Sequence, residues 1–133
     1  MHTYPPKILM AFGETFSEEK GEFLNWLLEG GYPELAALSN GIRGSQEATE
    51  WLLKNNFARF AAFDNAVGGS EKAYAWLLDN EENLLAVFVD AINNNMEALA
   101  WFKNHKLEIF IHLSRKIRNF RENQTFDYHK IHF

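Results

Sequence analysis

The stretch SQEATEWLLKNNFARFAAFDNAVGG, residues 45–69, decides the fold of this 133-residue chain because it recurs in altered form along the sequence. The following segment, residues 70–94, reads SEKAYAWLLDNEENLLAVFVDAINN. The tryptophans of the chain are also 25 residues apart, at Trp26, Trp51, Trp76 and Trp101. A fixed period of this length indicates a repeat architecture, in which one small unit stacks on copies of itself.

Each unit has the pattern of two helices joined by a turn. The predicted N-caps of the first helices stand six residues before a tryptophan, at Ser45, Ser70 and Asn95. In the first unit, Ser17 followed by Glu18 and Glu19 predicts a start about one turn earlier. The second helix has apolar residues 9, 12 and 16 places after the tryptophan, and this spacing forms one buried face. Glycine and asparagine follow both helices, where the left-handed conformation that ends a helix suits them.

These patterns predict an all-α protein with one domain over residues 1–133. We expect a short right-handed α-solenoid of four tandem 25-residue αα-hairpin repeats, over residues 17–44, 45–69, 70–94 and 95–119. A half-repeat helix over 5–16 is expected to cover the first unit, and a tail over 120–133 follows the fourth. The architecture resembles helical-hairpin solenoids such as tetratricopeptide and HEAT proteins. The period is shorter than theirs and their motif residues are absent, so no function is transferred.

The tryptophan row has two readings, a stacking surface for a ligand or a seam of the core. Because tryptophan recurs at the same place of every unit beside leucine, we predict that it lies in the core between helices. The fourth unit departs from the others at two places, with Lys103 instead of leucine and Lys116 instead of glycine or alanine. These lysines predict a terminal unit that no further repeat covers.

Composition excludes several classes of function. Residues 1–100 hold 6 basic against 15 acidic residues, and residues 101–133 hold 7 against 3, for a net charge of −5. An acidic body of this kind argues against nucleic-acid binding. The chain has no cysteine for a disulfide or a thiolate ligand. No apolar run reaches the length of a membrane span, so we expect a cytoplasmic protein without membrane contact.

The clearest metal-like pattern is His105, Glu108 and His112, which are spaced to fall near one face of a helix. Two imidazoles and a carboxylate can bind zinc and leave a position open. The alternative is a histidine in a turn beside an exposed Glu108–His112 pair, and we favour it. A second pair, His129 and His132, is a weaker candidate. Because no glycine-rich phosphate loop and no nucleophile with an adjacent base and acid is evident, we expect a non-enzymatic protein without a cofactor.

The face of the second helices opposite the buried stripe remains as a candidate binding surface. Small and polar residues form a row there when the units are stacked: Ala37, Asn40, Ala62, Asn65, Val87, Asp90, His112 and Arg115. Solenoids commonly bind partners along such rows. We therefore expect a protein-interaction or scaffold module with a protein partner. The alternative is a metal- or small-molecule-binding protein centred on the two histidines and glutamate above.

The tail is too apolar for a solvated, disordered segment. Its large apolar residues are Phe126, Tyr128, Ile131 and Phe133. We expect it either to fold back on the body or to dock on a second copy and form a homodimer.

Overall fold

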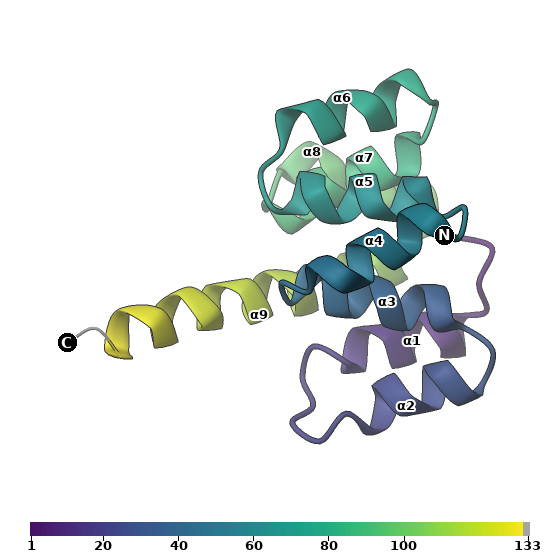
Figure 1. The fold of residues 1–133 in the computed structure, drawn as a ribbon. Coiled ribbons are helices and arrows are strands. Elements are labelled where there is room, and N and C mark those ends of the chain that lie inside the picture. Colours follow the sequence, from purple (N-terminus) through teal and green to yellow (C-terminus); the bar gives the residue numbers. More distant parts are fainter. Residues whose placement is uncertain (132–133) are drawn as a thin grey trace.

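The chain is all-helical in a computed structural model, which describes the backbone of residues 1–131 and the side chains of residues 1–124. This range contains nine helices and no strand (Figure 1). In chain order the helices are α1 (Pro6–Glu14), α2 (Glu22–Glu29), α3 (Pro33–Ile42), α4 (Gln46–Lys54), α5 (Ala58–Val67), α6 (Glu71–Asp79), α7 (Asn83–Ile92), α8 (Met96–Asn104) and α9 (Glu108–Ile131).

The predicted helix starts are confirmed in three units and wrong in the first. Ser45, Ser70 and Asn95 each accept a hydrogen bond from the backbone N–H three residues on, at 3.2, 3.1 and 3.0 Å. Ser17 does not cap α2. The carboxylate of Glu18 accepts instead from Phe23 N at 2.6 Å and Leu24 N at 3.2 Å. The helix therefore begins only after Gly21, whose φ of 75° is left-handed.

Five helices, α1, α3, α5, α7 and α9, form what we call the inner bundle. Each packs on the next in this order, and α9 packs in turn on α1. Every predicted apolar place of the second helices is buried here: Leu35, Leu38, Ile42, Phe60, Phe63, Val67, Leu85, Phe88, Ile92, Phe110, Leu113 and Ile117. Phe88 lies at the centre, with ring centroids 4.8 Å from Phe63 and 5.3 Å from Phe110. Burial of each such side chain stabilises the fold by about 1.5–3 kcal/mol.

The other four helices, α2, α4, α6 and α8, are the outer helices. Each packs on two consecutive inner helices, and no two of them approach within 8 Å between Cα atoms. They are anchored by the residue directly after each tryptophan, because Leu27, Leu52, Leu77 and Phe102 have no exposed surface. The outer helices therefore stand apart as separate ridges on the inner bundle (Figure 1).

The prediction that the tryptophans lie in the core is wrong for Trp26 and Trp76, whereas Trp51 and Trp101 pack against the core while partly buried. Trp26 is 42% exposed and Trp76 is 37% exposed, while Trp51 and Trp101 are half-buried. On an outer helix the place after the tryptophan points at the inner bundle, so the tryptophan lies on the flank. No two outer helices have Cα atoms within 8 Å of each other, so no neighbouring outer helix packs closely on this flank.

Neither lysine of the fourth unit marks an uncovered end. The place of Lys103 is exposed in every unit, since Leu28, Leu53 and Leu78 are each about half exposed. The flank of Lys116 is covered by α1. Lys116 Nζ lies 3.3 Å from Glu14 Oε1 and donates to Ser17 Oγ at 2.9 Å. The first and last inner helices therefore close the array on itself.

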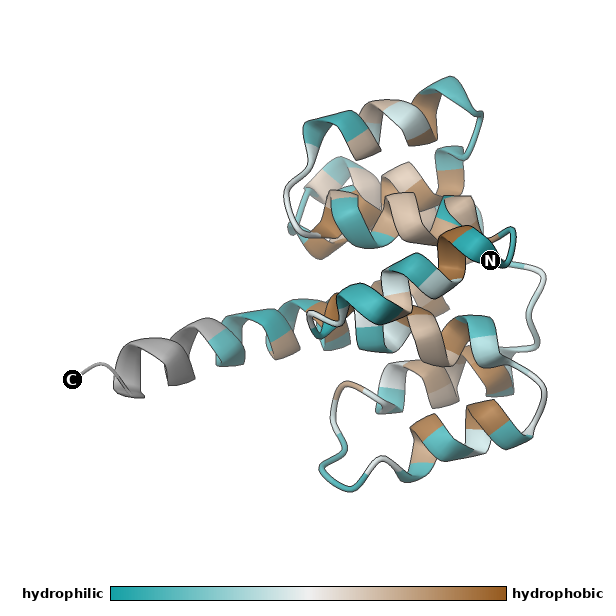
Figure 2. Cartoon of the chain, in the orientation of Figure 1, coloured by the Kyte–Doolittle hydropathy of each residue, from teal (hydrophilic) through white to brown (hydrophobic). Residues whose placement is uncertain are grey.

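The segment expected to be a tail begins as part of α9, which has no break at residue 120. Phe120 lies on its own chain, 5.7 Å from the ring of Phe16 and under the guanidinium of Arg43 at 5.3 Å. Glu122, Asn123 and Gln124 are exposed, and the helix then projects beyond the body (Figure 1). It is mostly hydrophilic where it leaves the inner bundle (Figure 2). The side chains of Phe126, Tyr128, Ile131 and Phe133 lie outside the described residues.

Candidate functional site

The space between the outer helices α2 and α4 is a groove of about 330 Å³, called here the α2–α4 groove. Leu28 of α2 and Trp51 of α4 line its two sides, and Ala37 and Asn40 of α3 lie between them. Leu28 is 48% exposed. The lining also includes Ser45 and Glu47, so the groove combines apolar side chains with an amide, a hydroxyl and a carboxylate, which suits a segment of a protein partner.

Trp51 is held in place by a stack of aromatic rings. Its centroid is 6.1 Å from that of Phe57, with the planes 9° apart, and Phe57 stacks in turn on Phe60 at 5.9 Å. The guanidinium of Arg59 lies 4.7 Å from the Phe60 centroid. A tryptophan fixed in this way can contact a partner with little loss of side-chain entropy.

A second groove, the α1–α2 groove, has the same construction one unit earlier. It measures about 470 Å³ and is lined by Lys7, Met10, Ala11, Glu14, Glu22, Phe23 and Trp26. Met10 is the fifth residue of α1, as Ala37 is of α3, and Phe23 precedes its tryptophan by three places, as Ala48 does. The sequence pattern predicts α1 only as a helix that covers the first unit, so it does not reveal this site. The signal in the sequence is the size of Met10 and Phe23, which are larger than Ala37 and Ala48 at the equivalent places.

The predicted partner row is distributed over several parts of the surface. Ala37 and Asn40 share the α2–α4 groove, Asn65 lines a different pocket with Arg121, and His112 and Arg115 line a third with Phe16. Ala62, Val87 and Asp90 are half-exposed on α5 and α7. An outer helix packs across each of the pairs α3–α5 and α5–α7, so the row is interrupted. Partner binding by these residues stays a prediction.

Two carboxylates of the second helices bind outer helices of their own chain. Asp90 accepts a hydrogen bond from the Tyr74 hydroxyl at 2.8 Å, and Asp64 accepts from Thr49 at 2.6 Å. Burial raises the pKa of Asp64, while the Thr49 hydrogen bond and the charge of Arg121 oppose the rise. Burial, then the bond to Asp90, raises the pKa of Tyr74. Both carboxylates thus have a structural role, joining α6 to α7 and α4 to α5.

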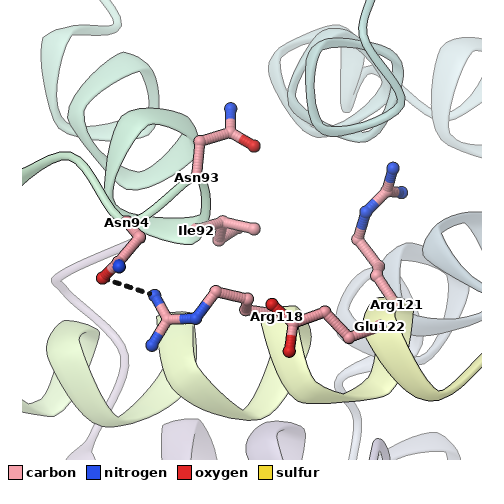
Figure 3. Close-up of a pocket in the computed structure, with 6 residues that line it drawn as sticks. All are labelled: Ile92, Asn93, Asn94, Arg118, Arg121 and Glu122. Carbon is pink, nitrogen blue, oxygen red and sulfur yellow. Dashed lines mark hydrogen bonds between the residues drawn. The ribbon is translucent and has the colours of Figure 1, made fainter.

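A pocket of about 500 Å³ lies where α7 ends beside α9, as Figure 3 shows. Arg118 donates there to the Asn94 side chain at 3.2 Å and to the Ala91 carbonyl at 3.4 Å. A cation at the carboxyl end of a helix stabilises the partial negative charge of the free carbonyls. The position of Arg118 is therefore explained by its hydrogen bonds to the C-terminal end of α7, and no ligand is needed to account for it.

The proposed metal-binding residues are not brought together. Among the described residues, no three histidine, aspartate or glutamate side chains are placed to bind one ion. His105 Nδ1 is 2.8 Å from the Trp101 carbonyl, and its ring stacks on the indole at 4.0 Å. Glu108 is exposed at the start of α9, whereas His112 is half-buried beside Phe16. The side chains of His129 and His132 lie outside the described residues.

The described helices include none with the length and apolar character needed to cross a bilayer. No protein family, no curated protein and no solved structure shows a significant match to this chain.

Proposed function

We propose that this chain is a non-enzymatic, cytoplasmic protein-interaction module, built from four helical-hairpin repeats that close into a compact array. Equivalent hydrogen bonds support the repeat. Asn55 and Asn80 each donate a side-chain hydrogen bond at 2.8 Å to the carbonyl of the tryptophan four residues earlier, and His105 stands in the same relation to Trp101. The N-caps of α4, α6 and α8 recur in the same way.

One observation supports the interaction role most directly. No two outer helices have Cα atoms within 8 Å of each other, and the α2–α4 groove between two of them has a positioned tryptophan and a half-exposed leucine. In a module that served only stability, closer outer helices would cover these side chains. Exposed apolar residues gathered in a groove are typical of a docking site for a protein segment.

Filling the groove tests this function. Ala37→Arg places a long charged side chain between Leu28 and Trp51, and we expect it to abolish capture of the native partner while the melting temperature stays near that of the wild type. Ala75→Arg is the matched control, because Ala75 is exposed on α6 away from the groove. Both variants and the wild type are used as bait in extracts of the native host.

The interaction role of this groove is supported if a protein retained by the wild type and by Ala75→Arg is lost with Ala37→Arg. Equal retention of every bound protein by the two variants would show that the groove is only solvent-exposed surface. Circular dichroism and melting of each variant separate this outcome from loss of the fold.

A further inference from the structure

Two exposed aromatic side chains and one exposed methionine line the α1–α2 groove together. Phe23 is 40% exposed, and Trp26 and Met10 are each 42% exposed. The charged residues that line the groove are Lys7 and Glu22, both exposed, and Glu14, which binds Lys116. A contiguous apolar surface of this kind on a small domain is typical of a protein contact.

The end of α9, after Arg121, continues past the helices on which the rest of α9 packs (Figure 1). The packing of α9 involves α1, α7 and α8, and its last residue with a described aromatic contact is Phe120. The helix continues for ten more residues after Arg121, to Ile131. Ten helical residues extend for about 15 Å, and Figure 1 shows this part, the C-terminal extension, pointing away from the body.

The sequence of residues 122–133, which contains the C-terminal extension, is suited to an apolar groove. It contains Phe126, Tyr128, Ile131 and Phe133. Large apolar residues at this density favour burial by about 1.5–3 kcal/mol each. Because α9 points away from the body in Figure 1, a second copy of the chain can offer the complementary surface.

Charge favours the same pairing. Residues 1–34, which include both helices of the groove, have 2 basic and 6 acidic residues, a net charge of −4. Residues 115–133 have 5 basic and 2 acidic residues, a net charge of +3. Opposite charges on two surfaces steer their encounter and select the correct partner.

We propose that the α1–α2 groove binds the C-terminal extension of a second copy of this chain. The extension lies in the groove as a helix, with apolar residues against Met10, Phe23 and Trp26. Each copy offers one groove and one extension, so reciprocal binding closes a two-fold dimer. This site is separate from the α2–α4 groove and does not depend on the function proposed for it.

The oligomeric state of the full chain tests the pairing. Light scattering over a dilution series is expected to give a dimer for the wild type. Phe23→Ser with Trp26→Ser, and separately Phe126→Ser with Ile131→Ser, are expected to weaken the dimer by about thirtyfold or more, as loss of central aromatic contacts does. Trp76→Ser with Leu78→Ser is the matched control, because it removes a similarly exposed pair from α6 and should leave the dimer intact.

A direct binding measurement identifies the contact. A labelled synthetic peptide of residues 120–133 is titrated with the Phe126→Ser, Ile131→Ser variant, whose groove is free, and its fluorescence anisotropy is expected to rise. The rise should disappear when Phe23→Ser and Trp26→Ser are added to that variant, and it should weaken at higher salt.

A wild type that stays monomeric at every concentration, with no peptide binding, overturns the proposal. So does a dimer that the groove variant leaves unchanged, because the contact would then lie elsewhere. Circular dichroism of each variant ensures that a monomer is a folded one. Loss of partner capture by Ala37→Arg would bear on the α2–α4 groove alone, so the two proposals can fail separately.

Discussion

The inner bundle and the outer helices use apolar residues in opposite ways. Each inner helix packs on two others in a closed cycle, and aromatic rings such as Phe63, Phe88 and Phe110 meet at its centre. Each outer helix has one fully buried residue after its tryptophan and no outer neighbour. The inner helices therefore supply most of the buried core, and the outer helices supply accessible apolar surface along their flanks.

This contrast teaches that apolar character alone does not locate the core of a repeat. Tryptophan is the most regular residue of the chain, yet Trp26 and Trp76 remain more than a third exposed. The leucine beside each is fully buried. A side chain is buried when it points from its helix toward another packed helix, whatever its apolar character.

The largest expected effect is in the inner bundle. Phe88→Ala removes contacts to three aromatic rings, those of Phe63, Phe102 and Phe110. We expect a loss of about 3–5 kcal/mol in the free energy of unfolding, measured by urea denaturation followed by circular dichroism. A loss below about 1 kcal/mol would mean that the bundle is not the centre of stability.

The next comparison uses neighbouring residues of α6. Leu77→Ala is expected to lower the free energy of unfolding by about 2–5 kcal/mol, because the side chain is fully buried. Trp76→Ala should lower it by only about 1 kcal/mol, since the larger side chain is 37% exposed. Urea melts of the two variants decide the order. A larger loss for Trp76→Ala than for Leu77→Ala would indicate that Trp76 belongs to the core.

A smaller effect is expected where α3 meets α5. An ideal Cβ on Gly41 would lie 2.7 Å from Asp64 Oδ2 and 3.2 Å from Thr49 Oγ1. Gly41→Ala should therefore disturb the Thr49–Asp64 hydrogen bond and lower stability by about 1–3 kcal/mol, partly offset by the higher helix propensity of alanine. In an Asp64→Ala background the loss should shrink, and a double-mutant cycle measures the difference. Equal losses in both backgrounds would contradict the steric explanation.

The smallest expected effect is a pH dependence. Burial raises the pKa of Asp64 above its ordinary 3.8, so the folded state holds this proton more tightly than the unfolded state. The stabilising contribution of the group is complete below pH 3.8 and declines as the pH rises through the folded pKa. We expect the stability of the wild type relative to Asp64→Asn to be lower at pH 7 than at pH 4, measured by urea denaturation. A constant difference would mean that burial does not shift the titration.

Local features of the hairpins could be predicted residue by residue. Ser45, Ser70 and Asn95 cap their helices as expected, because capping depends on a side chain and an amide three residues away. The buried stripe of the second helices follows from the helical period. Ser17 failed as a cap because Glu18, with two acceptor oxygens, competes for the same helix start.

The candidate sites were predicted less well, because they depend on spacing between helices. Ala37 and Asn40 were identified and do share a groove, but Leu28 and Trp51 beside them were assigned to packing. The α1–α2 groove joins Met10 to Trp26 across a turn whose geometry is set by Gly21 and Glu18. The spacing between helices that forms each groove has no counterpart in the periodicity of a single helix.

The sequence by itself determined the all-helical class, where most helices begin and end, and which residues of the second helices are buried. These properties depend on hydrogen bonds and spacings within a few residues. Only the tertiary structure decided that α9 packs on α1, with Lys116 reaching Glu14 and Ser17 about a hundred residues earlier. It also decided that Trp26 and Trp51 line open grooves. Both are consequences of how far apart packed helices stand, and that distance depends on every side chain between them.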